Sequence, residues 1–287
     1  MAITSNEKTM IHTFGWPTGI CSWSLQQNLT GVAACLRSLG IQHIHLAVGQ
    51  PNDRDSGAFL TEAQAQDWII TSAMIDFAQE DYSSLESIRL TGGIVPDAQW
   101  PSNRQRFIQA ADLAAALGTP FLSMHAGFLD PAQTGRTRIF HDRIQCLADA
   151  AGEKNLTLLL ETGQESAADL REFLEELAHP AVGLNFDPAN MILYDKDDPV
   201  SAVKILAPWI RHAHVKDAVR TQIPGQWGRE VPWGEGEVGG DAFLLALQAT
   251  GFNGAVAIER ESGTQRLTDI ATAVKRLASS ALPNNSA

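Results

Sequence analysis

Short apolar segments that resemble β-strands alternate with helix-like segments from one end of the chain to the other. This alternation predicts a parallel sheet, because each helix carries the chain back to the edge of the sheet where the next strand begins. Eight such units in 287 residues predict a single (β/α)8 barrel rather than an open, doubly wound sheet. The expected strands are residues 19–25, 41–48, 68–77, 119–128, 157–161, 182–187, 210–216 and 255–259.

The segments between these strands have helical spacing and helix-terminating residues. The expected helices are residues 29–40, a helix that begins at Thr61, and residues 101–118, 137–152, 166–177, 199–206, 241–250 and 267–279. Residues 82–96 fit a short helix with a loop, and residues 221–240 fit a long loop rich in Gly, Pro and Trp. We expect one domain over residues 1–287, with a loose arm at about 1–14 and a loose tail at about 281–287.

The charge balance limits the classes of function. The chain has 33 acidic and 21 basic residues and a net charge of −12, which argues against a surface for nucleic acid or for anionic lipid. We find no signal-peptide core and no apolar run of membrane-spanning length, so we expect a cytoplasmic protein. Its three cysteines lack CxxC spacing, and neither a disulfide framework nor a zinc knuckle is predicted.

Charged residues end four of the expected strands. Glu161, Asp187 and Glu259 end three apolar strands, and His214 lies near the end of a fourth. Because side chains alternate along a strand, His214 points to the same side as His212 and Lys216. The carboxyl ends of barrel strands form one face, so three carboxylates and one imidazole should meet there. Such hard oxygen and nitrogen donors predict a site for one divalent ion, Mn²⁺, Mg²⁺ or Co²⁺, with Zn²⁺ as an alternative.

Several sequence motifs resemble those of the xylose isomerase-like barrel family. They are ETGQE (161–165), NFDPANM (185–191), HAHVKD (212–217), GEGEV (234–238) and AIERE (257–261). The motifs cover the second half of the chain densely, whereas the first half matches only in its alternation of strands and helices. This family includes sugar isomerases, ketose 3-epimerases, inosose dehydratases and endonuclease IV.

The resemblance to the ketose 3-epimerases implies specific roles. It makes Glu161, Asp187, His214 and Glu259 the ligands of one metal ion. It also makes Glu161 and Glu259 the acid and base that exchange a proton at the carbon next to a substrate carbonyl, through an enediolate. Glu165 and Arg220 match residues that contact substrate oxygens in those epimerases. Asn190 stands where they have a histidine. As a candidate substrate-binding residue it can still hydrogen-bond a hydroxyl group, but it cannot carry the charge of a histidine.

Other candidate residues keep two interpretations. Lys216 fits either a group that polarises a substrate oxygen or one member of an ion pair with a nearby carboxylate. His125, at the end of the fourth expected strand, fits either the mouth of the barrel or a backbone contact. His43, His45 and His212 fit the core. Trp23, Trp227 and Trp233 fit either stacking on a sugar or ordinary packing.

These residues predict a metal-dependent isomerase or epimerase that acts on a keto-sugar or a related polyol. A lyase or hydrolase on the same scaffold, such as an inosose dehydratase or an enzyme that cleaves keto-glycosides, begins with the same proton abstraction and stays as the alternative. An endonuclease IV-like nuclease and a non-catalytic sugar binder are weaker alternatives. We expect a small carbohydrate partner, no nucleic acid and no membrane, and the sequence leaves open whether the chain forms a homo-oligomer.

Overall fold

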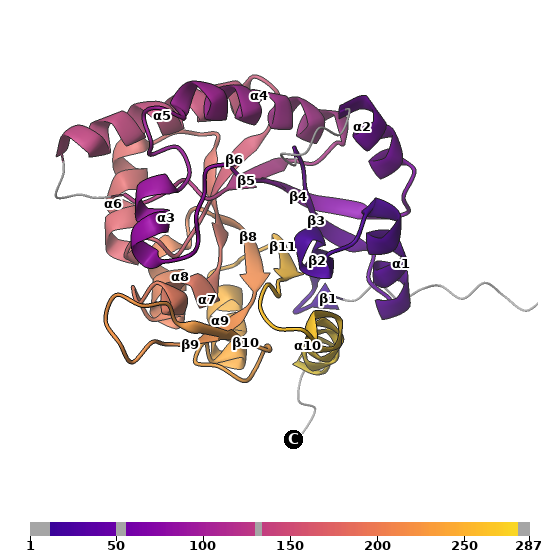
Figure 1. Ribbon diagram of the computed structural model, residues 1–287. Coiled ribbons are helices and arrows are strands. Elements are labelled where there is room, and N and C mark those ends of the chain that lie inside the picture. The colour runs from indigo at the N-terminus through magenta and orange to yellow at the C-terminus, as the bar shows by residue number, and fades with distance from the viewer. Residues whose placement is uncertain (1–11, 50–55, 130–133, 281–287) are drawn as a thin grey trace, which may run out of the picture.

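The structure, a computed structural model, describes residues 12–49, 56–129 and 134–280. Eight parallel strands within these residues close into a barrel, in which β2 pairs with both β3 and β11. The barrel strands are β2 (Trp16–Cys21), β3 (His43–Ala47), β4 (Ile69–Ile75), β5 (Phe121–Met124), β6 (Thr157–Glu161), β7 (Val182–Phe186), β8 (Ile210–Val215) and β11 (Ala255–Ile258). This closed sheet confirms the predicted (β/α)8 barrel (Figure 1).

Helices surround the strands, and the short helices fill the connections between them (Figure 1). They are η1 (Ser22–Leu25), α1 (Leu29–Leu39), α2 (Ser56–Gln64), α3 (Leu85–Thr91), α4 (Trp100–Ala116), α5 (Thr134–Gly152), α6 (Ala167–Leu177), α7 (Pro188–Leu193), α8 (Pro199–Leu206), α9 (Gly240–Ala249) and α10 (Arg266–Ser280). Among the described helices, we find none with both the length and the apolar character needed to span a membrane.

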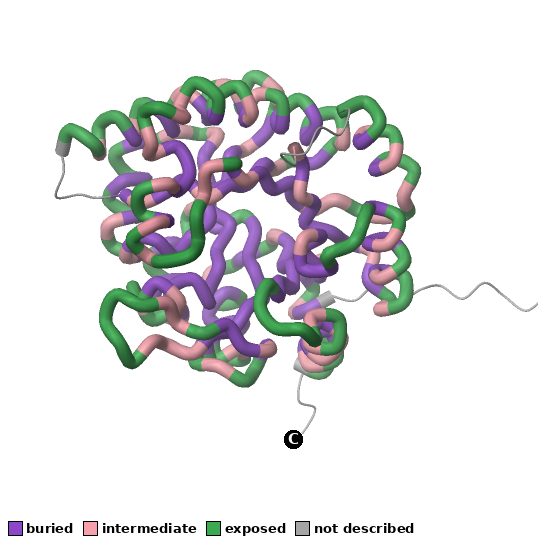
Figure 2. The backbone as a smooth tube through the Cα atoms, viewed as in Figure 1, coloured by how far each residue is buried: buried purple, intermediate pink, exposed green. Residues whose placement is uncertain are grey.

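The strands form the buried centre, and the helices expose their outer sides to solvent (Figure 2). Apolar side chains between the strands and the helices make up most of the core. The inside of the barrel also holds polar groups, including the fully buried His45, Ser123, Asn185 and His212. These groups contact one another across different strands, so the burial of their polar atoms is compensated by hydrogen bonds.

The first expected strand and the second expected helix differ from the prediction. Its strand is β2, which starts at Trp16, and residues 22–25 form the 3₁₀ helix η1 instead of continuing the strand. Trp23 therefore lies on η1 and not on the first strand. The second helix, α2, begins at Ser56 rather than at Thr61.

The expected N-terminal arm is partly ordered. His12–Thr13 forms β1, which pairs antiparallel with the start of β2. Phe14 and Gly15 both have positive φ, as a two-residue hairpin turn that matches strand twist requires. Residues 1–11 of the predicted arm and the predicted tail at 281–287 lie outside the described residues.

A buried aspartate organises the segment that follows β8. The expected loop at 221–240 contains β10 (Arg229–Val231), which forms a hairpin with β9 (Asp217–Val219). Asp217 is 1% exposed, and its carboxylate accepts hydrogen bonds from the backbone N–H groups of Ala218, Gly234, Gly236 and Val238. A Cβ atom at Gly236 would lie only 2.2 Å from Asp217 Oδ1, so this close approach requires glycine.

We predict that Asp217→Ala lowers the free energy of unfolding by roughly 3 kcal/mol, because it leaves several buried N–H groups without an acceptor. Urea denaturation measures the change. The control is Asp198→Ala, which removes an exposed N-cap from α8 and should cost only about 1 kcal/mol. Equal losses in the two variants would contradict the role given to Asp217.

Candidate active site

Four strand ends bring their charged side chains to one place. Glu161 ends β6, Asp187 follows β7, His214 lies on β8, and Glu259 follows β11. One ligand atom from each lies within 4.8 Å of the others, and all four residues are buried. Parallel pairing explains the convergence: Glu161 lies opposite Asn185 on β7, and His214 lies opposite Ala257 on β11. The structure thus assembles the four predicted ligands, and their role in metal binding stays a prediction.

The donor atoms at the centre of this group fit a cation. His214 Nδ1 lies 3.1 Å from Glu259 Oε2, 3.5 Å from Asp187 Oδ2 and 3.7 Å from Glu161 Oε1. His214 Nδ1, Asp187 Oδ2 and Glu259 Oε2 are buried, and among the described residues these atoms face one another and the Lys216 ammonium. The outer oxygen of Asp187 is satisfied, since it accepts from the N–H groups of Ala189 and Asn190 at the start of α7. Inward-facing carboxylates of this kind are costly to bury unless a positive charge meets them, and three oxygens with one imidazole suit a divalent ion.

Lys216 supplies part of that positive charge. Its Nζ atom lies 2.8 Å from Glu259 Oε2, 2.8 Å from Glu261 Oε2 and 3.5 Å from Asp187 Oδ2. The ion pair with a neighbouring carboxylate, one of the two interpretations from the sequence, is therefore present. Lys216 also lines the adjacent cavity, so the pairing leaves its role toward a ligand open.

Two further candidates contact Glu161. Asn190 Nδ2 donates a hydrogen bond of 3.0 Å to Glu161 Oε1, and His125 Nε2 lies 3.6 Å from the same oxygen. Both residues line the cavity. Gly163 (φ 133°) allows α7 to approach the segment after β6, because a Cβ atom at this position would lie 2.2 Å from Asn190 Cβ.

Glu165 and Arg220 are not part of this group. Arg220 forms an ion pair with Asp195 at 2.6 Å and donates to the carbonyl of Asp197 at 2.9 Å. Glu165 is buried, and neither residue is among the described residues that line the cavity. In this conformation neither side chain faces the cavity, and their contacts with a substrate stay predictions.

A cavity of about 810 Å³ adjoins the site, and of the four side chains Glu259 is the one that lines it. Sequence reasoning missed several of its walls, which come mainly from segments after the strands: Glu80, Tyr82, Tyr194, Glu230 and Glu261. Trp23 and Trp227 also line it, and Trp23 Nε1 donates to Glu259 Oε1 at 2.6 Å. Trp233 packs against Phe243 in the core instead. Glu261 had a signal in the sequence, because it lies two positions beyond Glu259.

Comparison with known protein families identifies the family of the chain. The model of the xylose isomerase-like TIM barrel family matches residues 36–280. The chain belongs to this family. No curated protein matches it significantly.

Solved structures of other members share the fold. A xylose isomerase domain protein from Planctomyces limnophilus is 31% identical, with a TM-score of 0.85 over 92% of this chain and 97% of that one. A xylose isomerase-like barrel protein from Mycobacterium smegmatis in complex with magnesium is 18% identical, with a TM-score of 0.70 over 94% and 98%. A D-allulose 3-epimerase from Methylomonas sp. in complex with D-allulose is 18% identical, with a TM-score of 0.65 over 88% of each chain. The last two similarities show the fold alone.

The two candidate catalytic glutamates of this xylose isomerase-like protein have different electrostatic surroundings. Burial raises the pKa of Glu161 to about 7, with help from the carboxylates of Glu259 and Asp187 and against the effect of His125 and His214. Burial would also raise the pKa of Glu259, but the Lys216 ammonium and the His214 ring hold it well below 4.5. At neutral pH one carboxyl group is therefore largely ionised while the other is close to half protonated.

We predict that Mn²⁺ binding near pH 6 releases one proton from Glu161 and a second from His214, because both ligands must lose a proton to bind the ion. Burial opposes a charge on His214, but Cys21 and the carboxylates of Glu259 and Glu161 raise its pKa well above 6.5. The affinity should then rise by up to about a hundredfold per pH unit below pH 7 and by about tenfold per unit just above it. Calorimetric titration with MnCl₂ in buffers of different protonation enthalpy measures both quantities. An affinity that is constant between pH 5.5 and pH 8, without proton release, would be inconsistent with this assignment.

Glu165 generates a separate prediction about stability. Burial raises the pKa of Glu165 to about 8 from an ordinary value of 4.5. Between these values the folded protein holds a proton that the unfolded chain has released, so stability falls as the pH rises from 4.5 to 8. Glu165→Gln should therefore be more stable than the wild type by roughly 2–4 kcal/mol at pH 8.5 and nearly equal to it at pH 4.5.

Urea denaturation at the two pH values measures this difference. Glu172→Gln, on the exposed side of α6, is the matched control and should show no pH-dependent change relative to the wild type. A Glu165→Gln protein that is less stable than the wild type at pH 8.5 would show that the ionised carboxylate is stabilised in the fold.

Proposed function

We propose that this protein is a divalent-cation-dependent isomerase or epimerase that moves a proton at the carbon next to the carbonyl of an uncharged keto-sugar or related polyol. One observation carries the proposal: Glu161, Asp187, His214 and Glu259 converge beside a cavity, and the two glutamates favour opposite protonation states. Pairs of carboxyl groups whose surroundings separate their pKa values are characteristic of acid–base catalysis. The fold shared with a magnesium complex and with a D-allulose 3-epimerase supports the same reading.

The ligand set proposed for the ion is Glu161, Asp187, His214 and Glu259. A divalent cation held there would stabilise the negative charge that develops on a substrate carbonyl oxygen as the neighbouring carbon loses its proton. Two structural partners are in place for these ligands, because Asn190 holds Glu161 and the start of α7 holds Asp187. The carboxyl groups therefore have fixed orientations before any substrate arrives.

The protein's own carboxyl groups would carry out the proton transfers. Glu259, the ionised group, takes the proton from the C–H bond, whose electron pair forms a C=C bond while the carbonyl oxygen gains negative charge. For the second transfer Glu161, which gives up a proton when it binds the ion, must be protonated again in the substrate complex. It then returns a proton to the opposite face of the same carbon in an epimerisation. In an isomerisation it protonates the carbonyl carbon instead, and the neighbouring hydroxyl group passes its proton to the carbonyl oxygen, so that a new carbonyl forms. Each turnover then leaves the two glutamates with exchanged protonation states, and the reverse reaction or solvent exchange restores them.

The cavity wall favours a neutral sugar-like ligand. Trp23, Tyr82 and Trp227 offer aromatic faces, on which the C–H groups of a sugar can pack. Asn190 and His125 offer polar atoms for hydroxyl groups. Carboxyl groups outnumber cationic side chains on this wall, a balance that disfavours an anionic phosphate or carboxylate. The same balance disfavours a nucleic acid.

Hydrogen exchange gives the direct test of this function. The purified protein is stripped of metal, supplied with Mn²⁺ and incubated in D₂O with a panel of ketoses and keto-polyols. We expect at least one substrate to take up deuterium at carbon in a metal-dependent way and to give a product of otherwise unchanged mass. Loss of water from the product would instead assign the dehydratase alternative, and no exchange with any substrate would contradict the enolisation mechanism.

We predict that Glu161→Gln and Glu259→Gln each lower the exchange rate by about 10²–10⁴-fold, because each removes a positioned proton-transfer group. Glu172→Gln, on the surface of α6, is the matched control and should keep the wild-type rate. Rates are measured at saturating Mn²⁺, so that a weaker metal affinity does not produce the loss. Full activity in either site variant would remove that glutamate from the mechanism.

A further inference from the structure

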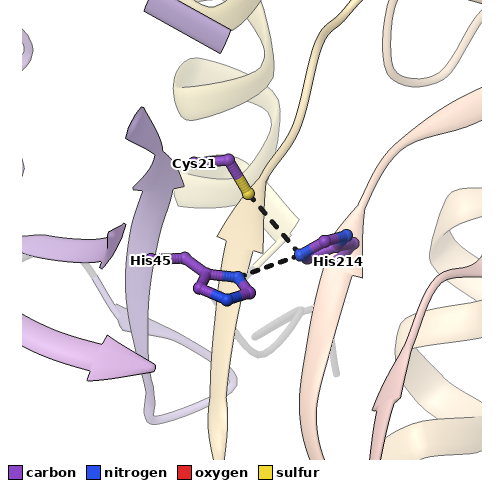
Figure 3. A group of neighbouring side chains, drawn as sticks. All are labelled: Cys21, His45 and His214. Carbon is purple, nitrogen blue, oxygen red and sulfur yellow. Dashed lines mark hydrogen bonds between the residues drawn. The ribbon is translucent and has the colours of Figure 1, made fainter. Parts of the chain in front are cut away.

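A chain of hydrogen bonds crosses the inside of the barrel beneath the site. His45 Nδ1 on β3 lies 3.0 Å from His214 Nε2 on β8 (Figure 3). On the other side of the same ring, His45 Nε2 lies 2.8 Å from Ser123 Oγ on β5. Ser123 Oγ lies 2.9 Å from the carbonyl oxygen of Ala73 on β4. The three side chains are fully buried, so water cannot complete their hydrogen bonds.

The last acceptor in this series of hydrogen bonds determines which atom donates at each contact. A carbonyl oxygen only accepts, so the short contact with Ala73 requires Ser123 to donate its single hydroxyl proton there. Ser123 must then accept from His45 Nε2, which leaves a lone pair on His45 Nδ1 in the neutral ring. That lone pair faces His214 Nε2, which must carry a proton for a contact of 3.0 Å to be favourable.

Two other groups lie near His214 Nε2. Cys21 Sγ lies 3.6 Å away (Figure 3). Asn185 Nδ2 lies 3.1 Å from Nε2 and 3.3 Å from Glu161 Oε2, and because an amide has two N–H groups, its bond to Glu161 does not by itself keep the second N–H from Nε2. The direction therefore rests on the contact between Ser123 and Ala73. If Nε2 accepted a proton instead, His45 Nδ1 would have to donate, and Ser123 would have to turn its proton away from Ala73. Two oxygen atoms 2.9 Å apart would then repel each other.

The Cys21, His45 and His214 group also has the composition of a metal site. Its geometry favours the hydrogen bond, because two imidazole nitrogens bound to one tetrahedral Zn²⁺ lie about 3.3 Å apart and these lie 3.0 Å apart.

We infer that His45 and Ser123 are positioning residues that hold a proton on His214 Nε2, so that Nδ1, which faces Glu161, Asp187 and Glu259, is the nitrogen that can bind the ion. The inference rests on the metal site of the proposed function, although the proton arrangement of His45 exists without any metal or turnover. Partners that orient ligating histidines in this way typically contribute a factor of 10–100 in metal affinity. The sequence analysis had placed His45 in the core without a role.

The first test determines the tautomer of His45 directly. Two-bond ¹H–¹⁵N correlation spectra of the protein labelled with ¹⁵N-histidine report which ring nitrogen carries the proton, and the signal that disappears in His45→Asn identifies the residue. We expect the proton on Nε2 and a bare Nδ1. A proton on Nδ1 would overturn the inference, whether or not the protein proves to be an enzyme.

The second test compares two substitutions of similar size. His45→Asn keeps an oxygen that can accept near the place of Nδ1, whereas His45→Leu has no acceptor. We expect His45→Leu to weaken Mn²⁺ affinity 10–100-fold and His45→Asn to stay within about threefold of the wild type. Free Mn²⁺ is measured by electron paramagnetic resonance during titration.

Thermal unfolding in EDTA measures the stability of each variant without metal, so that a loss of Mn²⁺ affinity can be told apart from a loss of stability. If the two variants lose Mn²⁺ affinity equally, or if His45→Leu keeps wild-type affinity, the positioning role is wrong. Mn²⁺ binding that follows the predicted pattern in a protein that exchanges no substrate proton would leave this inference intact while contradicting the proposed function. If His45→Leu fails to fold, the tautomer of His45 in the wild-type protein still tests the inference.

Discussion

Parallel pairing of the last four barrel strands is the constraint on which the rest of the site depends. In a parallel barrel every strand runs the same way, so all the residues that end strands gather at one rim. The registers of β6, β7, β8 and β11 bring Glu161, Asp187, His214 and Glu259 within reach of one another, although nearly a hundred positions separate the first from the last. An antiparallel arrangement would distribute the same residues over both ends of the sheet.

Three buried carboxyl groups close together repel one another when they are ionised, and the surrounding residues reduce this repulsion. Lys216 and His214 provide positive or proton-donating groups next to Glu259, and Asn190 donates to Glu161. The backbone at the start of α7 neutralises one oxygen of Asp187. The inward-facing atoms of His214, Asp187 and Glu259 face one another and the Lys216 ammonium, and together with Glu161 they match the ligand set of a divalent ion. Beneath them, His45 and Ser123 orient the imidazole from inside the barrel.

The barrel and the four strand-end residues could be predicted from the sequence because both depend on local patterns. Strand and helix periodicity repeats along the chain, and a charged residue at the end of an apolar strand is visible without any structure. The elements that were missed depend on long-range contacts. The β9–β10 hairpin lies in a segment rich in Gly and Pro, and Asp217 supports the turn after it through hydrogen bonds to residues 17 to 21 positions away. The 3₁₀ helix η1 continues a strand-like pattern, so periodicity alone could not end the strand at Cys21.

The same distinction applies to the site. His45 and Ser123 belong to strands far from the recognisable motifs, and only the closed barrel places them under His214. Arg220 fits a motif by position, but Asp195 and Asp197 on a neighbouring connection hold its guanidinium group, and no spacing rule indicates that pairing. Glu80 and Tyr82 line the cavity from the segment after β4, where the pattern allowed only a short helix and a loop. Motifs therefore located the centre of the site, whereas its walls and its supports required the fold.

The most direct measurement of the central claim is anomalous X-ray diffraction from crystals of the protein grown with Mn²⁺. We predict one strong anomalous peak bounded by carboxylate oxygens of Glu161, Asp187 and Glu259 and by His214 Nδ1, at the point where their inward-facing atoms converge. Metal at His214 Nε2, a peak at another place on the protein, or no peak in crystals saturated with Mn²⁺ would contradict the account.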